Sequence, residues 1–258
     1  MILDEIVAHK RVDVAVRMVR RSAAEVAAAA EQQPAPPDFR AALAGPELAV
    51  IAEIKGASPS AGTIRGAYDP VAMASAYAAG GAAALSVLTD ARYFRGSWED
   101  LRAVALGSPL PVLCKEFIID PYQIDEARAA GAAAVLLIAG VLSEEELRQF
   151  LEHARGRGLD ALIEVHTEKE VGSALRAGAD SIGVNNRDLR TLRVDLDTTA
   201  RLRPLIPEGI LVVSESGFER RAEVERVEQI GVDAILIGTA LMASADPAAT
   251  LRELRGVR

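Results

Sequence analysis

Hydrophobic residues in this chain recur in eight short runs, and each run is followed by a polar loop and a helix-like stretch. Apolar runs of this length predict strands that are buried on both faces, as in parallel sheets. The predicted strands are 48–54, 82–88, 111–117, 133–138, 160–166, 181–185, 210–215 and 233–238. Four strands are entered through similar phrases, AAGGAAALSVL, ARAAGAAAVLLI, ALRAGADSIGV and EQIGVDAILIG. Glycine there suits the left-handed residue that ends a helix, so the pattern indicates a repeated helix–strand unit.

Eight such units predict a closed parallel α/β barrel, the (β/α)8 or TIM barrel, which typically needs about 250 residues. The chain has 258 residues. An open doubly wound sheet is the alternative, but no G-x-G-x-x-G follows the first strand. No low-complexity linker interrupts the repeat after Pro46, so we interpret residues 1–258 as one domain.

The residues before the first strand form an N-terminal helical extension. An apolar stripe predicts a helix from residue 1 to about 33, and prolines end it. A second short helix is predicted over 39–44. A segment of this length would not build its own core, so residues 1–47 are interpreted as an addition to the barrel.

Composition excludes several classes of function. The formal net charge is −8 and the pI about 5.1, which does not support nucleic-acid binding. No run reaches 18 apolar residues, and the opening MILDEIVAHKR carries acids where a signal peptide is basic. The single Cys114 lies in an apolar strand, as expected of a packed thiol in a reducing cytoplasm. We expect no membrane contact, and a monomer or weak homodimer.

The stretch LAVIAEIKGASPSAGTIR, residues 48–65, organises the rest of the chain. Side chains alternate faces along a strand, so Ile51, Glu53 and Lys55 point to the same side. Charges at the end of a buried strand cost desolvation free energy, which favours a functional role over a structural ion pair, the alternative. A loop with Ser58 follows, and its hydroxyls and N–H groups suit an anion.

Other strand ends carry polar residues too, and catalytic groups of a barrel lie at those ends. They are Lys115 with Phe117, Glu164 with His166, Asn185 with Asn186 and Arg187, Ser214 with Ser216 on one face, and Gly238 with Thr239. Two of the only four lysines, Lys55 and Lys115, lie at such strand ends, although the chain has 25 arginines. Lysines, glutamates and neutral donors at one rim indicate proton transfer. The histidines lack metal-ligand spacing, so we expect no metal.

Two further features concern the substrate. SGF after the seventh strand and GTA after the eighth match the phosphate site that such barrels often hold, and Ser58 would close it. The alternative is that these glycines only serve turns. Phe94 and Phe117 follow strand ends and would contact an aromatic group, or else fill the core. His166 is interpreted as a packed or supporting histidine.

These motifs resemble those of the indole-3-glycerol phosphate synthase family. The matching stretches are MILDEIVAHKR, IAEIKGASPSAGTIR, LSVLTDARYFRGS, PVLCKEFIIDPYQIDEARAAGA, ALIEVHTEKE, IGVNNRDLRTL, VVSESGF and ILIGTALM. The resemblance covers essentially the whole chain. It implies closure of 1-(2-carboxyphenylamino)-1-deoxyribulose 5-phosphate to indole-3-glycerol phosphate with loss of CO2 and water, in tryptophan biosynthesis. No cofactor is implied, because the iminium formed on ring closure serves as the electron sink.

The resemblance also implies roles for individual residues. Lys115 would be the general acid of ring closure, Lys55 would pair with carboxylates and act in the later proton transfer, and Glu164 would serve the dehydration. The other implied residues are Glu53, Asn185 and Ser216 for catalysis and orientation, Ser58, Gly217, Gly238 and Thr239 for the phosphate, Phe94 and Phe117 for the aromatic ring, and Arg187 for substrate binding. The extension would lie across the barrel top.

The chain departs from the family pattern at three positions. Gly56 and Ala61 replace basic residues common in this loop, and Thr239 stands where Ser is usual, so the phosphate site is expected to be less positive. Two other functions are considered. Phosphoribosylanthranilate isomerase, another phosphosugar barrel, would need a Cys or Asp acid–base pair at the rim, and Cys114 has the wrong parity. A non-catalytic phosphosugar-binding protein would not need the paired lysines and glutamates.

Overall fold

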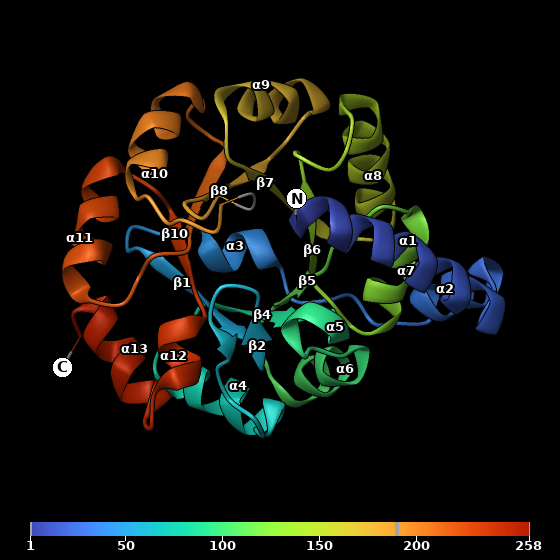
Figure 1. The fold of residues 1–258 in the computed structure, drawn as a ribbon, viewed down its shortest axis with the longest axis horizontal. Helices are drawn as coiled ribbons and strands as arrows, with labels where there is room; N and C mark the ends of the chain where they lie inside the picture. Colours follow the sequence, from blue (N-terminus) through green and yellow to red (C-terminus); the bar gives the residue numbers. More distant parts are fainter. Residues whose placement is uncertain (1, 189–190, 258) are drawn as a thin grey trace.

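Eight parallel strands close into a barrel in the computed structural model, which describes residues 2–188 and 191–257 (Figure 1). They are β1 (Ala49–Ile54), β4 (Ala84–Leu88), β5 (Val112–Lys115), β6 (Ala134–Ile138), β7 (Asp160–Val165), β8 (Ser181–Asn185), β9 (Leu211–Glu215) and β10 (Ala234–Ile237). β1 closes the ring, because Ile51 pairs with Leu236 on one side and with Ala84 on the other. The predicted (β/α)8 fold is confirmed, and each predicted strand boundary is within two residues of the observed one.

Helices surround the barrel and cover the outward faces of its strands. The outer helices are α4 (Pro70–Ala79), α6 (Trp98–Gly107), α7 (Pro121–Ala129), α8 (Glu144–Gly156), α9 (Glu168–Ala177), α10 (Asp197–Leu202) with a 3-10 turn (Arg203–Leu205), α11 (Arg221–Ile230) and α13 (Pro247–Arg255). The glycines Gly81, Gly131, Gly178 and Gly231 of the four repeated phrases have φ values of 87°, 90°, 89° and 80°. The repeated phrase is therefore a left-handed exit from a helix, as predicted.

Three small elements lie in the loops at the carboxyl ends of the strands. A two-stranded ribbon, β2 (Ala57–Ser58) and β3 (Gly62–Thr63), follows β1. The short helix α5 (Ala91–Phe94) follows β4, and α12 (Thr239–Ala243) follows β10. These loops shape the end of the barrel at which the predicted polar residues lie.

Inside the barrel, apolar side chains give way to polar ones along the strand direction. Ile51, Leu113, Leu136, Leu162, Val213 and Leu236 form one buried interior cluster. Two residues further along their strands, the inward positions are Glu53, Lys115, Ile138, Glu164, Glu215 and Gly238. Because all strands are parallel, these positions meet at the carboxyl end of the barrel.

The N-terminal extension contains two helices before residue 33, where the sequence predicted one. α1 (Ile2–Arg20) and α2 (Ala23–Glu31) are separated at Ser22. The Ser22 side chain accepts a hydrogen bond from the Glu25 N–H, and the Glu25 carboxylate accepts one from the Ser22 N–H at 2.8 Å. This capping box starts a new helix, which explains the break.

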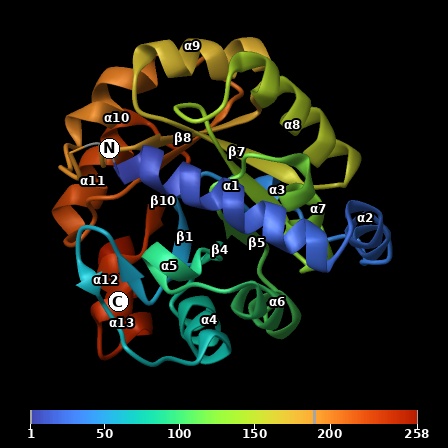
Figure 2. The same cartoon turned by 45° about the vertical axis from the view of Figure 1, so that its right-hand side comes forward.

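The two ends of the barrel are covered by different parts of the extension. α1 crosses the carboxyl end (Figure 2), where Ile2, Leu3 and Ile6 line the pocket. α3 (Phe39–Leu43) instead lies at the opposite end, where the Arg40 N–H donates to Asp160, the first residue of β7, at 3.0 Å. The prediction that all of residues 1–47 lie over the top is therefore wrong for α3. Phe39 and Leu43 of α3 pack into the barrel interior and close its amino-terminal end.

A buried ion cluster fastens α1 to the barrel. Lys10 Nζ lies 2.8 Å from Asp90 Oδ2 and 2.9 Å from Glu116 Oε1. Thr89 also donates to Glu116, at 2.9 Å, and all of these side chains are buried. Burial disfavours the charged form of Lys10, but the two carboxylates outweigh this effect and raise its pKa. α1 is thus held by charges, and Lys10 is not a surface lysine.

Residues 2–188 and 191–257 contain no candidate for a membrane-spanning helix. No helix within them combines the length and the apolar character needed to cross a bilayer.

Candidate active site

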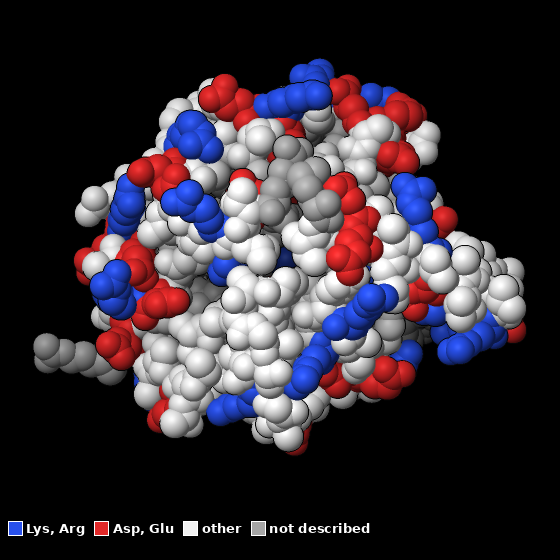
Figure 3. Space-filling model, in the orientation of Figure 1, with Lys and Arg blue, Asp and Glu red and all other residues white. Residues whose placement is uncertain are grey.

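A cavity of about 320 Å³ opens at the carboxyl end of the barrel, beneath α1. In Figure 3 it is a hollow near the centre of this face, with basic atoms visible inside it. All of the site residues proposed from the sequence line this one cavity: Glu53, Lys55, Ser58, Phe94, Lys115, Phe117, Glu164, Asn185, Arg187, Ser216, Gly217, Gly238 and Thr239. The loops and strand ends that carry them therefore converge, although they span most of the chain.

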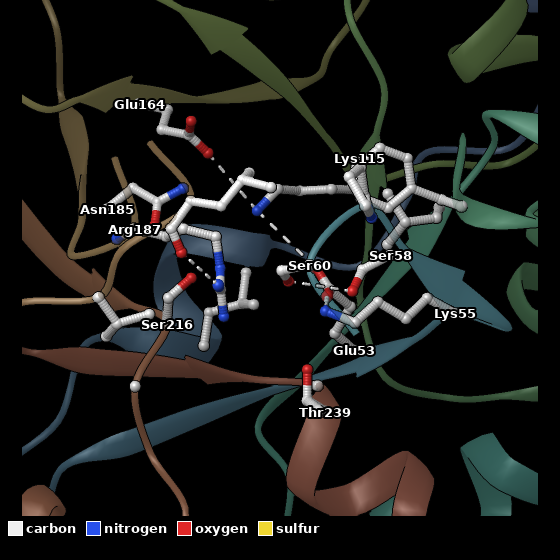
Figure 4. A pocket seen from close by; sticks show the side chains of 18 of the residues that line it. Glu53, Lys55, Ser58, Ser60, Lys115, Glu164, Asn185, Arg187, Ser216 and Thr239 are labelled. Atoms are coloured by element: carbon white, nitrogen blue, oxygen red, sulfur yellow. Dashed lines mark hydrogen bonds and ion pairs between the residues drawn. The ribbon is translucent and has the colours of Figure 1, made fainter. Parts of the chain in front are cut away.

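Lys115 lies among three carboxylates. Its Nζ is 2.6 Å from Glu215 Oε2, 3.6 Å from Glu164 Oε2 and 3.8 Å from Glu53 Oε2. Figure 4 shows the ammonium between Glu164 and Glu53. Burial disfavours the charge of Lys115, but Glu215, Glu53 and Glu164 outweigh this and raise its pKa. Lys115 is therefore protonated near neutral pH and carries a proton that it can donate.

Glu53 is shared between the two lysines. Lys55 Nζ lies 2.6 Å from Glu53 Oε1, and Ser86 donates to Oε2 at 3.4 Å. Burial favours the neutral carboxyl, but Lys55 and Lys115 outweigh it and lower the pKa of Glu53. A Cβ added at Gly238 would come within 2.6 Å of Glu53 Oε1 and 3.0 Å of Lys55 Nζ. Gly238 therefore leaves room for this ion pair, a role that goes beyond the predicted phosphate contact and beyond its alternative, a simple turn.

Glu215 belongs to the cluster and was missed by the sequence analysis. The sequence pattern predicts Ser214 and Ser216 on the inward face of β9, which would turn Glu215 outward. In the structure Glu215 points inward, and Ser214 contacts Asn186 and Thr199 on the outer side. Burial, opposed by Lys115 and reinforced by Glu164, raises the pKa of Glu215 to about 7. A carboxyl with that pKa can exchange a proton with its neighbour near neutral pH.

A glycine in the adjacent strand was the available signal for Glu215. A Cβ added at Gly183 would come within 2.2 Å of Glu215 Oε1. Glycine inside a strand often marks a place where another group approaches closely. Gly183 therefore makes space for the missed carboxylate.

Ser216 and Gly217 reach the pocket through a turn with unusual backbone conformation. Both residues have positive φ, 67° for Ser216 and 94° for Gly217. Asn186 holds this turn by donating to the carbonyl oxygens of Glu215 at 3.0 Å and Ser216 at 3.1 Å. A non-glycine residue in the left-handed region is uncommon and often functional. Ser216 thus lines the pocket because of the turn, and not because of strand parity.

The remaining lining residues include a polar group and an aromatic pair. Ser58, Gly217, Gly238 and Thr239 come from the loops after β1, β9 and β10. Phe94 and Phe117 lie on the loops after β4 and β5, with ring centroids 5.9 Å apart. The pocket thus suits a molecule with one polar, anionic end and one flat apolar end.

Arg187 and Asn185 lie at the end of β8. The Asn185 side chain accepts a hydrogen bond from the Arg187 N–H at 3.0 Å. The Arg187 guanidinium donates to the Leu192 carbonyl at 2.9 Å, and burial lowers the pKa of Arg187.

Among residues 2–188 and 191–257, no group of three or more His, Cys, Asp and Glu has the geometry of a metal site.

The whole chain is similar to a known protein family. The family model described as indole-3-glycerol phosphate synthase matches residues 3–254. The curated indole-3-glycerol phosphate synthase of Mycolicibacterium gilvum (strain PYR-GCK) is 48% identical over 253 residues, which are 98% of this chain and 93% of the relative. The protein of the same name from Dehalococcoides mccartyi (strain CBDB1) is 47% identical over 258 residues, 98% of this chain and 100% of the relative.

Solved structures that are more distant in sequence support the fold alone. The 3-hexulose-6-phosphate synthase of Salmonella typhimurium matches with a TM-score of 0.66 at 16% identity, covering 81% of this chain and 97% of that one. A mutant tryptophan synthase α-subunit from Pyrococcus furiosus matches with a TM-score of 0.59 at 15% identity, covering 81% and 98%. The barrel is shared with these enzymes. The match of this chain to the family model and to the curated relatives covers nearly its full length and shows more than a shared fold. This chain belongs to the indole-3-glycerol phosphate synthase family.

Proposed function

We propose that this pocket converts 1-(2-carboxyphenylamino)-1-deoxyribulose 5-phosphate to indole-3-glycerol phosphate, CO2 and water. Membership of the family supports the reaction. The observation that carries the proposal for this chain is Lys115, which lies within 4 Å of three buried carboxylates in a pocket lined by both polar and aromatic residues. A proton donor, proton acceptors and two distinct binding regions are what this reaction needs.

In this proposal the substrate spans the pocket from the loops to the aromatic pair. Its phosphate is bound by Ser58, Gly217, Gly238 and Thr239, and its carboxyphenyl ring lies against Phe94 and Phe117. Among the lining residues that the structure describes, Lys55 and Arg187 are the cations besides Lys115. Since Gly56 and Ala61 add no charge to the first loop, we infer that these cations supply most of the attraction for the substrate's anionic groups.

Ring closure needs a proton at the carbonyl oxygen. The ring carbon that bears the carboxylate attacks the carbonyl carbon, a carbon–carbon bond forms, and Lys115 delivers a proton to the developing alkoxide. Glu215, 2.6 Å away with a pKa of about 7, is placed to return a proton to Lys115. The carboxylate then leaves as CO2, and the electron pair of the broken bond neutralises the adjacent iminium.

Dehydration requires an acid and a base on the same rim. The hydroxyl made in the first step is protonated and leaves as water. A base then removes a proton from the new ring, and this removal completes the aromatic indole. We assign Glu164 to this step, paired with Lys55 or Lys115, and we assign Asn185 and Ser216 to holding the hydroxyl groups of the substrate. Glu53, whose pKa is lowered, stays ionised and fixes both lysines.

The two alternative functions are weaker on physical grounds. An isomerase of the phosphoribosylanthranilate type would need a thiol or an aspartate at the rim, whereas Cys114 is fully buried on the outward face of β5. A non-catalytic phosphosugar-binding protein has no use for a lysine among three carboxylates, because burying such charges costs free energy.

Indole fluorescence separates the three functions. The purified protein is mixed with the carboxyphenylamino substrate, and the appearance of indole emission is followed with time. The proposal predicts catalytic turnover to an indole product. Binding without a change of emission would indicate the binding protein, and a non-fluorescent isomerised product would indicate the isomerase.

Replacing Glu164 by glutamine is expected to lower kcat by about 100-fold or more, the usual scale of general acid–base catalysis. Glutamine keeps the size and hydrogen bonding of Glu164 but cannot titrate. Steady-state kinetics with the same substrate measure the effect, with KM expected to change much less. A loss of less than about fivefold would make Glu164 only a structural partner of Lys115.

We also propose that the protein works in the cytoplasm as a monomer or weak homodimer. The net charge of −8 and the one buried cysteine are compatible with a reducing compartment. Sedimentation at several protein concentrations measures the oligomeric state. A stable tetramer at all concentrations would contradict this part of the proposal.

A further inference from the structure

His166 lies beside the proposed active site, and no step of the reaction above uses it. It follows β7, two residues after Glu164, and its side chain is 16% exposed. Its Nε2 lies 3.7 Å from Glu164 Oε1, and its Nδ1 lies 3.6 Å from Glu170 Oε2. Nε2 is buried and has no hydrogen-bond partner. A buried unpaired nitrogen costs free energy, so its position calls for an explanation.

Three carboxylates act on this imidazole from three elements. Glu164 belongs to β7, Glu170 to the first turn of α9, and Glu215 to β9. Burial favours the neutral ring, but Glu170, Glu164 and Glu215 outweigh it and raise the pKa of His166 above its ordinary value. The ring therefore carries a positive charge further into the neutral pH range than an exposed histidine does.

Glu170 fixes the position of this residue. Its carboxylate accepts a hydrogen bond from the His166 N–H at 2.6 Å, and its own N–H donates to Thr167 at 3.3 Å. Backbone and ring of His166 thus face the same anchored carboxylate. The free nitrogen, Nε2, is left directed toward Glu164.

The two oxygens of Glu164 face two different cations. Oε2 is 3.6 Å from Lys115 and Oε1 is 3.7 Å from His166. A carboxylate with a cation beside each of its oxygens is held in one orientation by the two attractions. If His166 only filled space, nothing would require its unpaired Nε2 to lie beside Glu164, the carboxylate assigned to dehydration.

We propose that His166 is a positioning residue for the reaction: its protonated ring, anchored by Glu170, holds the Glu164 carboxylate turned toward Lys115. This inference rests on the proposed function. As pH rises and His166 loses its proton, Glu164 loses one of its two cations. The contribution of His166 to kcat is therefore present at low pH and disappears as pH rises through the pKa of His166.

His166→Asn tests the proposal, because asparagine keeps a polar side chain but cannot become a cation. At a pH where wild-type His166 is protonated, kcat of the variant is expected to be about tenfold lower, the change that corresponds to one pKa unit of coupling. KM is expected to stay nearly constant. The ratio of wild-type to variant kcat should fall toward one with rising pH. A ratio that does not depend on pH would overturn the proposal, since lost packing has no such dependence.

His153→Asn is the matched control. His153 lies on α8, where its Nε2 is 2.8 Å from Asp125, outside the pocket lining. Its replacement is expected to leave the pH profile of kcat unchanged. A similar pH-dependent loss in this control would also overturn the proposal, because the effect would not be specific to His166.

A second measurement does not depend on activity. The chain has three histidines, His9, His153 and His166, so their ring signals can be followed by NMR during a pH titration. Glu164→Gln is expected to lower the midpoint of His166 and leave that of His153 in place. An unchanged His166 midpoint would overturn the coupling even if the enzyme is active. A wild-type protein that makes no indole would end the proposed function, whereas this titration would still report the contact.

Discussion

Replacing Lys115 by arginine is expected to lower kcat by at least about 100-fold while the protein folds normally. The variant keeps a positive charge near Glu53, Glu164 and Glu215, so the net charge of the pocket does not change. Arginine spreads its charge over a planar head and gives up a proton far less readily than lysine does in most sites. If Lys115 only neutralised the carboxylates, arginine would replace it nearly as well.

The proton step explains why lysine is required although its own pKa is raised. The carbonyl oxygen becomes a strong base only as the new carbon–carbon bond forms, and a lysine ammonium at that oxygen can protonate it as this happens. The short contact to Glu215, 2.6 Å, then offers a group that titrates near neutral pH to restore the proton. A guanidinium in the same space would meet the substrate with a different shape and fixed donor directions.

Lys55→Arg is the matched comparison for Lys115→Arg. Lys55 contacts one carboxylate, Glu53, at 2.6 Å, so part of its role is electrostatic and a milder loss of kcat is expected. Steady-state kinetics of both variants and binding of a phosphorylated substrate analogue are measured side by side. Equal and small losses at the two positions would contradict the assignment of Lys115 as general acid.

Replacing Lys10 by methionine is expected to reduce the free energy of unfolding by about 3–5 kcal/mol, the usual cost of removing one partner of a buried ion pair. Methionine has a similar length but leaves Asp90 and Glu116 without the cation that lies 2.8 and 2.9 Å from them. Lys10 is only 2% exposed, so water does not easily take its place. Urea denaturation of the wild-type and variant proteins measures the difference.

Lys169→Met is the control for this comparison. Lys169 is exposed on α9, and a substitution at such a site usually changes stability by less than about 0.5 kcal/mol. If the free energy of unfolding of the Lys10 variant lies within about 1 kcal/mol of the wild-type value, α1 is held by its apolar contacts alone.

The barrel could be predicted from sequence because its signals are local and repeated. Apolar runs with β-branched residues, and a left-handed glycine after each helix in four units, are visible in short windows. Polar residues at the carboxyl ends of the runs were equally visible. Parallel strands bring those ends together whatever the details of the loops, and this placed Glu53, Lys115 and Glu164 in one pocket.

Glu215 was missed because strand parity is ambiguous where both faces are buried. Leu211, Val212 and Val213 are all apolar and buried, so the sequence alone does not say which of them points inward. The two serines were placed inward for their hydroxyl groups. Only the neighbouring Gly183, which leaves space for the Glu215 carboxylate, decides the question, and its meaning depends on the register between β8 and β9.

The burial of Lys10 could not be predicted because its partners are distant in sequence. Glu116 lies 106 residues away, and the contact exists only once α1 crosses the carboxyl end of the barrel. The position of α3 at the opposite end depends in the same way on tertiary packing, since the apolar side chains of Phe39 and Leu43 could cover either end of the barrel. Helical periodicity reports that a face is apolar, and not which surface covers it.

The most direct test of the account is the stoichiometry of CO2 and indole from substrate that is isotopically labelled in its carboxyl carbon. The wild-type protein is predicted to release one labelled CO2 for each indole-3-glycerol phosphate formed, and Lys115→Arg to release neither at a comparable rate. A phosphorylated product that retains the label, or CO2 release that survives in the Lys115→Arg variant, would contradict the claim that Lys115 and its carboxylates carry out the ring closure.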